Sequence, residues 1–340
     1  MSAPTYRTRS NWPRSFAFVL VPDFSMMPFT AAIEPLRVAN RMRESELYRW
    51  NTLSSDGNPV RASNGTAVEV DGALAQAGDF DAIVVCAGVN AYDQRDPVLA
   101  GQLRRLSRRD CLIGSVCSGS ILLADAGLLE GRRCTGHWED LETLAENYPA
   151  LEVTKSIFEI DGSRFTCSGG TAPLDLMIHF ISMDFGRDLA AQVADQMLHH
   201  SARQAAGPQR LDLSQRTGVR NPRLLDVIAA MEANLESPLP LGELADVAGL
   251  SLRQLERLFA AEQGSRPGRY YRQLRLLRAR QMIQKTGLSM LEVAVATGFS
   301  SATHFARSYR LAFGRSPSAE RGATAPLRPA RPAGAIAPPA

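Results

Sequence analysis

The sequence predicts an α/β domain followed by a second, all-α domain. Up to about residue 200, short apolar runs rich in β-branched residues alternate with segments of helical spacing. This alternation is typical of a mainly parallel sheet that is covered by helices on both faces. Beyond Pro222 every apolar segment has helical spacing. The chain has 340 residues and is 45% hydrophobic and 21% charged, which suits about two globular domains.

The elements of the first domain follow one another as strand and helix. A hairpin is expected in KSIFEIDGSRFTCSG, with its turn at Asp161-Gly162. Residues 203–221 are polar and have no sustained period, so we expect a linker between domains at 15–202 and 222–322. Residues 1–14 and 323–340 have no pattern, and we expect disordered tails there. The strand and helix pairs are SFAFVLV with IEPLRVANRM, FDAIVVCAG with VLAGQLRRL, and CLIGSV with SGSILLADAGLL.

Cysteine spacing and hydropathy exclude several classes of protein. The cysteines are odd in number and have no metal-like spacing, so we expect no disulfide framework, no metal site and no cofactor. No apolar run reaches the roughly 18 residues that span a bilayer, and the first residues lack the apolar stretch of a signal peptide. We therefore expect a cytoplasmic protein without a membrane partner. The five cysteines are Cys86, Cys111, Cys117, Cys134 and Cys167.

Basic charge is concentrated near the C-terminus. Residues 251–322 hold 13 Arg and Lys against 4 Asp and Glu, although the net charge of the whole chain is only +3. An acidic body with a basic end suggests a nucleic-acid contact. A solvated arginine-rich surface is the alternative.

The all-α region contains an internal repeat. LERLF at 255–259 is followed by Gly264 and Pro267, and FARSY at 305–309 is followed by Gly314 and Pro317 at the same offset of 50 residues. In each copy a short helix, a glycine turn and a second helix succeed one another, which is the helix-turn-helix arrangement. Its second helix can lie in the major groove of DNA. The turns are expected at Gly249 and Gly298, and capping boxes at Ser251 with Gln254 and at Ser289 with Glu292.

These two units, the linking helix RYYRQLRLLRARQMIQ and the run VAVATGFSSATHFARSYRLAFGRSPS resemble the AraC/XylS family of transcription regulators over about 100 residues. The resemblance implies recognition helices at about Leu252 to Gln263 and Ala302 to Leu311, with duplex DNA and RNA polymerase as partners. At Glu320 the sequence departs from the family, which often has an aromatic residue there. Two of the implied contacts, at repeated positions, could equally hold phosphate or buttress the fold. The implied DNA contacts are Arg253, Gln254, Arg257, Ser301, Thr303, His304 and Arg307, of which Arg257 and Arg307 are the repeated pair.

Cys117 is expected at the sharp turn between an apolar strand and a helix in SVCSGSILLADAGLL. At such an elbow the N–H groups of Ser118, Gly119 and Ser120 and the helix dipole lower the pKa of a thiol and bind an anion. His137 follows 20 residues later, after another strand-like run. A Cys and a His in this layout serve cysteine-dependent acyl transfer, and a structural role for both is the alternative.

From Phe16 to about His200 the chain resembles the ThiJ/PfpI branch of the class I glutamine amidotransferase-like superfamily. The resemblance is carried by IEPLRVANR, VVCAG, VCSGSILLADAGLL, GHW and CSGGTAPLDL. It implies a flavodoxin-like sandwich with Cys117 at its pocket. Enzymes of this branch place an acid beside the thiol from the loop after the first strand, where this chain reads DFSMMPF. Asp23 and Glu34 flank that loop without matching, so we expect no enzyme, although Glu139 or Asp140 could orient His137.

An AraC-type end behind a PfpI-like front is the layout of GlxA-type regulators. AAIEPLRVANRMRESELYRWNTLSSDG is especially similar to regulators of carnitine and glycine betaine catabolism, and more weakly to an arginine regulator. The resemblance implies a homodimeric transcription regulator, an activator by family habit, that senses a small metabolite. Two alternatives remain open: an amidase or hydrolase that uses Cys117 and His137, and a front domain that only dimerises.

A zwitterion such as carnitine or a betaine needs an anion site and an aromatic wall. We expect the carboxylate at the N–H groups of Ser118 and Gly119, beside Cys117 and His137. We expect the trimethylammonium group against Trp138. If Trp138 is instead a core residue at the start of its helix, this wall is lost. The remaining residues expected to line the site are Phe24 or Phe29 opposite Trp138, and Gly88.

Overall fold

The computed structural model describes residues 14–199 and 202–323. The chain divides into two compact units that part between Leu211 and Asp212. The expected tails at 1–14 and 323–340 lie outside the described residues except at their inner ends. Arg14 is already part of the first strand and is buried against Asp184, with Nη2 and Oδ1 at 2.8 Å. The first strand therefore begins at Arg14, the last residue of the segment that was expected as a tail.

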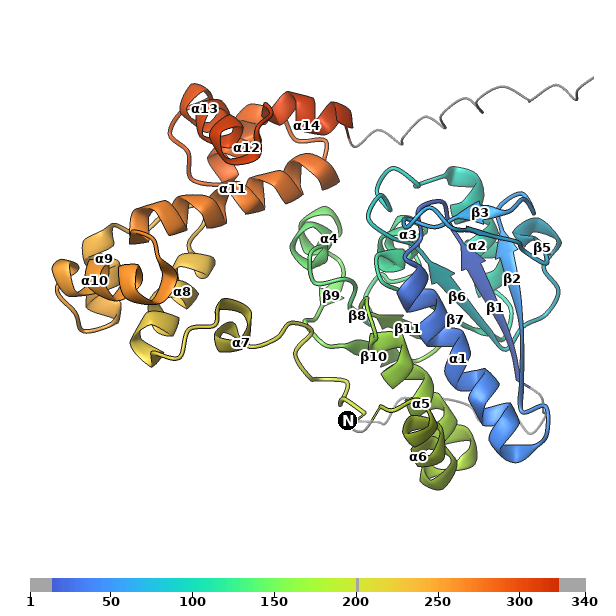
Figure 1. The fold of residues 1–340 in the computed structure, drawn as a ribbon. Helices are drawn as coiled ribbons and strands as arrows, with labels where there is room; N and C mark the ends of the chain where they lie inside the picture. The colour runs from blue at the N-terminus through green and yellow to red at the C-terminus, as the bar shows by residue number, and fades with distance from the viewer. Residues whose placement is uncertain (1–13, 200–201, 324–340) are drawn as a thin grey trace, which may run out of the picture. The chain divides into compact units, whose positions relative to one another are not determined.

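The first unit is built on a seven-stranded sheet of order β10-β11-β7-β6-β1-β2-β5 (Figure 1). All neighbours run parallel except the hairpin of β10 and β11. Gly162 and Ser163 form its turn, one residue later than predicted, because the first turn position has φ 61 and this favours glycine. The strands are β1 (Arg14–Leu20), β2 (Tyr48–Ser54), β5 (Gly72–Ala73), β6 (Ala82–Cys86), β7 (Leu112–Val116), β10 (Phe158–Asp161) and β11 (Arg164–Cys167).

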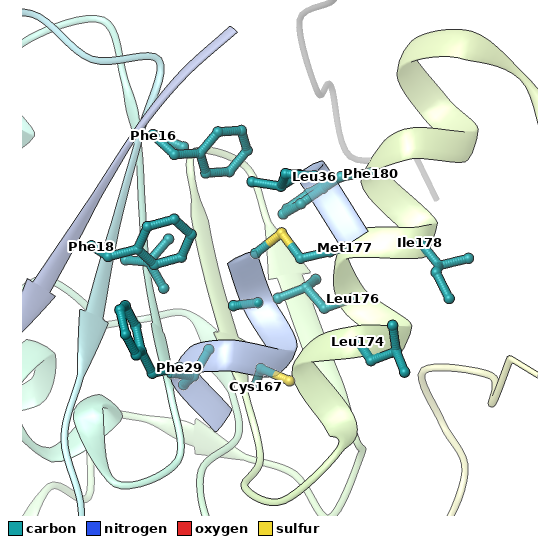
Figure 2. Packing of buried hydrophobic residues seen from close by; sticks show 14 of the residues in the cluster. Phe16, Phe18, Phe29, Leu36, Cys167, Leu174, Leu176, Met177, Ile178 and Phe180 are labelled. Carbon is teal, nitrogen blue, oxygen red and sulfur yellow. The ribbon is translucent and has the colours of Figure 1, made fainter. Parts of the chain in front are cut away.

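Helices cover both faces of this sheet, as the alternating pattern predicted. On β1, Phe16 and Phe18 pack in the core that includes α1 and α5, whereas Ala17 and Val19 pack in the core that includes α2 and α3. Figure 2 shows Phe16 and Phe18 on the side of Leu36 and Met177. Both faces of a parallel strand are thus apolar, which explains the continuous run in the sequence. The helices are α1 (Met26–Arg43), α2 (Pro97–Ser107), α3 (Gly119–Asp125), α4 (Leu141–Asn147), α5 (Ala172–Phe185) and α6 (Arg187–Gln196), with a 3-10 turn at Leu74–Gln76.

Two small sheets complete the first unit. They pair β3 (Val60–Arg61) with β4 (Ala67–Val68) and β8 (Arg133–Cys134) with β9 (Glu152–Val153). The second pair leads directly into the residues around His137. Within the described residues, no helix is long and apolar enough to cross a membrane.

The second unit is entirely helical, as predicted. Its N-terminal half has one core and its C-terminal half another, and α11 contributes buried residues to both. The predicted α/β domain with a second all-α domain is therefore confirmed. The helices are α7 (Leu213–Thr217), α8 (Pro222–Ala233), α9 (Leu241–Val247), α10 (Leu252–Gln263), α11 (Pro267–Lys285), α12 (Met290–Ala296), α13 (Ala302–Phe313) and α14 (Pro317–Ala323).

The segment expected as a linker, 203–221, is attached to both units. Arg203 binds the buried carboxylate of Asp175 on α5 through Nη2 at 2.7 Å. Further along, Arg216 on α7 forms two hydrogen bonds with Glu232 on α8. The polar composition that predicted a linker does not indicate these contacts, because the partners of both arginines lie elsewhere in the sequence.

Candidate functional site

Cys117 lies between β7 and α3 with φ 57, a conformation that non-glycine residues rarely adopt. Its N–H donates to the carbonyl of Ser168, which follows the end of β11. Backbone strain of this kind costs on the order of 1–3 kcal/mol and persists only where the surroundings hold it. The structure thus has the elbow that the sequence suggested.

The thiol of Cys117 contacts Ser25, a residue that the sequence analysis did not single out. Its Sγ donates to Ser25 Oγ at 3.6 Å, and Ser25 comes from the loop after β1. Gly88 holds this loop in place, because a Cβ at Gly88 would lie 2.2 Å from Asp23 O and 3.1 Å from Ser25 Oγ. The absence of a side chain at Gly88 therefore allows the Ser25 loop to pack closely at this point. The signal in the sequence is the hydroxyl of Ser25 in the run DFSMMPF, which has no carboxylate at the corresponding place.

Burial raises the pKa of the Cys117 thiol, which corrects the expectation of a lowered pKa. Cys117 is 6% exposed, and burial is the largest cause of the rise. The Ser25 and Ser118 hydrogen bonds act in the opposite direction, while the negative charge of Asp140 adds to the rise. The protonated thiol is thus favoured at neutral pH.

His137 lies beside Cys117, as expected. A Cβ at Gly169 would be 2.6 Å from His137 Cδ2 and 3.2 Å from Cys117 Sγ, so both side chains border the same glycine. Glu139 Oε2 lies 3.9 Å from His137 Nδ1, which is longer than a hydrogen bond. Asp140 accepts a 2.6 Å hydrogen bond from Ser118 Oγ, so this carboxylate is bound to the elbow.

The elbow that was expected to border an open pocket is closely packed in this structure. Ser118 and Gly119 are buried, and a Cβ at Gly119 would lie 2.4 Å from Val85 O, so α3 is packed against β6. A groove of about 790 Å³ is present elsewhere in the first unit, and Cys117 is not part of its lining. It is bordered by α5, α6 and residues 202–205, and its lining includes Phe158, Asp175, Ile178, His179, Ala190, Ala194, His199 and Arg203.

The aromatic residues expected around a ligand differ in their placement. Phe24 is fully buried and packs edge-on against Phe29 with ring centroids 5.4 Å apart, so neither faces a ligand. The loop turns Phe24 inward because its carbonyl accepts from Ser63 N and its N–H donates to Val21 O. Trp138 is half-buried, its ring centroid lies 5.6 Å from that of His137, and it is not a core residue.

In the second unit, α10 and α13 each follow a short helix and a glycine turn. Gly249 and Gly298 have φ 62 and φ 70, which explains the glycine at both turns. Ser251 and Ser301 begin α10 and α13 and accept from the N–H groups three residues later. The two predicted capping boxes, Ser251 with Gln254 and Ser289 with Glu292, are present.

The seven residues expected to contact DNA are all exposed. Gln254 and Ser301 also have structural roles, because Gln254 Oε1 accepts from Ser251 N and Ser301 Oγ accepts from His304 N. The long helix α11 joins the two halves, and its 19 residues correspond to roughly 28 Å. The exposed set is Arg253, Gln254, Arg257, Ser301, Thr303, His304 and Arg307.

Comparisons with known proteins agree with both units. The DJ-1/PfpI family model matches residues 16–183, and a helix-turn-helix domain model matches residues 244–323. The chain is 46% identical over 315 residues to the HTH-type transcriptional regulator CdhR of Pseudomonas aeruginosa, which covers 93% of each chain. It is 39% identical over 305 residues to the HTH-type transcriptional regulator GlxA of Rhizobium meliloti, covering 89% of this chain and 94% of that protein. The chain belongs to the AraC family of transcriptional regulators.

A solved structure is also similar to this AraC-family protein. The crystal structure of an AraC family transcriptional regulator from Pseudomonas putida matches with a TM-score of 0.51 and 27% identity. The match covers 54% of this chain and 100% of that chain. The two family models and the similarity to GlxA confirm the GlxA-type layout, with a DJ-1/PfpI domain in front of an AraC-type helix-turn-helix pair.

Glu320 departs from the AraC pattern but is well accommodated. The residue is 2% exposed, and its carboxylate accepts from Arg280 Nε at 3.0 Å and from Gln284 Nε2 at 2.8 Å. Arg315 Nε lies 2.8 Å from the second oxygen. An ionic cluster thus fastens α14 to α11.

Proposed function

We propose that this protein is a sequence-specific DNA-binding regulator whose DJ-1/PfpI domain senses a small metabolite and has no catalytic role. The observation that carries the proposal is the matched pair of recognition helices, α10 and α13, each presenting exposed polar side chains at corresponding positions. By the habit of the family, the protein acts as an activator with RNA polymerase as partner. We propose further that it works in the cytoplasm as a homodimer.

Base reading is assigned first to Arg253 and Arg257 on α10 and to Thr303 and Arg307 on α13. Each pair is four residues apart and therefore lies on one face of its helix. Arginine can bind guanine in the major groove through two hydrogen bonds. His304 can reach bases or phosphate, whereas Gln254 and Ser301 keep fewer groups for DNA because they cap their helices.

The state of Cys117 supports a sensor over an amidase. Acyl transfer needs a thiolate and an oriented base, but here burial keeps the thiol protonated and the nearest hydroxyl is that of Ser25. The nearby carboxylate of Asp140 is held by Ser118. The Cys117 site therefore lacks the positive charge that would activate the nucleophile of a hydrolase.

The ligand we propose is a small zwitterion such as carnitine or glycine betaine. Trp138, a half-buried aromatic side chain beside His137, supports the proposal because it can bind the ammonium group of such a ligand. Its carboxylate is assigned to the N–H groups of Ser118 and Gly119 next to Cys117, which requires the packed elbow to open. A front domain that only dimerises is the second candidate, and the close packing of the elbow favours it.

Calorimetry on the full-length protein tests the sensor. Glycine betaine, carnitine and arginine are titrated separately, and saturable binding of one of the two quaternary ammonium compounds is expected. Arginine binding alone would replace the proposed ligand class. The absence of binding for all three, together with an intact dimer in sedimentation, would favour the dimerising role.

A further inference from the structure

The guanidinium group of Arg210 covers the ring of Trp138, to which we assign the ammonium group of the ligand. The Cζ atom of Arg210 lies 4.2 Å from the centroid of the Trp138 ring, within the range of a cation–π contact. Arg210 is exposed and Trp138 is half-buried, so the guanidinium group covers the ring from the solvent side. One face of an aromatic ring accommodates one cation at this distance.

The neighbouring residue anchors the same segment to the same loop. Gln209 Nε2 donates to Thr135 Oγ1 at 3.0 Å and to the carbonyl of Ser156 at 2.8 Å. Thr135 is fully buried, and its N–H donates to Thr166 Oγ1 on β11. Residues 209 and 210 are thus attached to the loop that carries His137 and Trp138, and this loop is fixed to the sheet.

The attached segment immediately precedes the second unit. The first unit ends at Leu211, and Asp212 begins the second by accepting a hydrogen bond from Gln215 N at the start of α7. Arg210, which covers the Trp138 ring, therefore lies two residues before the start of the second unit.

We propose that Arg210 occupies the face of the Trp138 ring when no ligand is bound. A quaternary ammonium ligand then binds to this face by displacing Arg210. Displacement removes the cation–π contact of Arg210 and loosens the segment 209–211 from the first unit. The inference rests on the proposed function because it concerns the same site, and it adds how occupancy reaches the DNA-binding unit. By linkage, the free energy that holds Arg210 on the ring is subtracted from ligand binding.

Removing the internal cation tests this competition in the full-length protein. Tetramethylammonium chloride and glycine betaine are titrated by calorimetry at constant ionic strength into wild type, Arg210→Ala and Arg43→Ala. Arg43, an exposed arginine at the far end of α1 from Ser25, is the matched control for lost charge. We expect Arg210→Ala to bind both compounds 3- to 10-fold more tightly and Arg43→Ala to match wild type. Weaker or unchanged binding to Arg210→Ala would overturn the inference, and weaker binding would indicate that Arg210 holds the ligand carboxylate.

A second variant separates this inference from the proposed ligand class. In Arg210→Ala/Trp138→Leu the gain in affinity should vanish, with thermal melting used to confirm that the protein is folded. If wild type binds neither compound but Arg210→Ala binds tetramethylammonium, the proposed zwitterion sensor is refuted. The inference that Arg210 blocks the Trp138 ring is then upheld. If wild type binds glycine betaine and Arg210→Ala binds it equally well, the sensor stands and the internal cation is refuted.

Amide hydrogen exchange provides a readout that does not depend on affinity. In wild type, glycine betaine should speed exchange at 209–211, and ligand-free Arg210→Ala should already exchange at that faster rate. Equal protection of this segment in ligand-free wild type and Arg210→Ala would contradict the proposed release.

Discussion

Ser118 Oγ donates a 2.6 Å hydrogen bond to the buried carboxylate of Asp140, and this bond joins the Cys117 elbow to the start of α4. Asp140 N also donates to the carbonyl of His137 at 2.8 Å. The negative charge of Asp140 acts on the adjacent thiol and helps to raise the pKa of Cys117. The elbow is thus fixed by a group that makes the thiol less reactive.

Neutralising that carboxylate should make Cys117 more acidic. In Asp140→Asn the amide oxygen can still accept from Ser118, but the repulsion that opposes the thiolate is gone, so the pKa of Cys117 should fall. The measurement is the rate of Cys117 alkylation by iodoacetamide against pH, followed by mass spectrometry. Glu139→Gln is the control, and a shift of equal size there would show that the effect is not specific to Asp140.

Ser25→Ala should move the same midpoint in the opposite direction. The variant removes a hydrogen bond that lowers the pKa of Cys117, while the backbone contact from Ser25 N to Ala87 O can remain. The alkylation midpoint should therefore lie at higher pH than in wild type. An unchanged midpoint would mean that the 3.6 Å contact between the thiol and the hydroxyl is not formed in solution.

The elbow and the helix-turn-helix pair could be predicted because each is encoded locally. A strand, VCSGS and a helix follow one another without interruption, and the glycine turns recur at a fixed offset in the second unit. The direction of the Cys117 pKa could not be predicted in this way. It depends on burial, which results from the packing of α3 against β6 and of the Ser25 loop.

The wall of the proposed ligand site was predicted only in part for the same reason. Phe24 was expected opposite Trp138 because it belongs to the loop after the first strand, but the direction of its side chain is set by Ser63 and Val21. The contact of Arg210 with Trp138 joins residues 72 positions apart, and the Gln209 hydrogen bond to Thr135 joins residues 74 positions apart. No local pattern in a polar segment indicates such a partner.

Cys117→Ser should leave DNA binding and regulation unchanged. The thiol is buried and protonated, so a hydroxyl of similar size can take its place beside Ser25. The check is operator affinity and reporter activity in both proteins, with ammonia release from amide substrates assayed in parallel. Ammonia release by wild type that is lost in the serine variant would establish an enzyme instead, because removal of a nucleophile abolishes turnover.

Glu320→Gln should destabilise the second unit while leaving the base-reading face unchanged. The substitution removes a buried negative charge that Arg280 and Arg315 approach at 3.0 and 2.8 Å. Both arginines are partly exposed and can be rehydrated, so we expect a loss of roughly 1 to 3 kcal/mol in unfolding free energy rather than the larger cost of a fully buried pair. Urea unfolding measures the loss, and Glu256→Gln, at an exposed position on α10, is the control. Equal stability of the two variants would show that the cluster contributes nothing.

The last prediction separates base reading from helix capping on α10. Arg253→Ala should cost roughly 1 to 3 kcal/mol of affinity for one operator base, the value of a lost two-bond contact, without lowering the melting temperature, because Arg253 is exposed. Gln254→Ala should instead lower stability, since its Oε1 accepts from Ser251 N at 2.8 Å, whereas Gln254→Glu should restore the capping box. Footprinting with single-base operator variants and thermal melting make the distinction. If Arg253→Ala weakens binding equally on every sequence, Arg253 holds the phosphate backbone.

Each wild-type protomer should protect two major-groove segments about 10 bp apart, and protection of one segment would contradict the tandem arrangement.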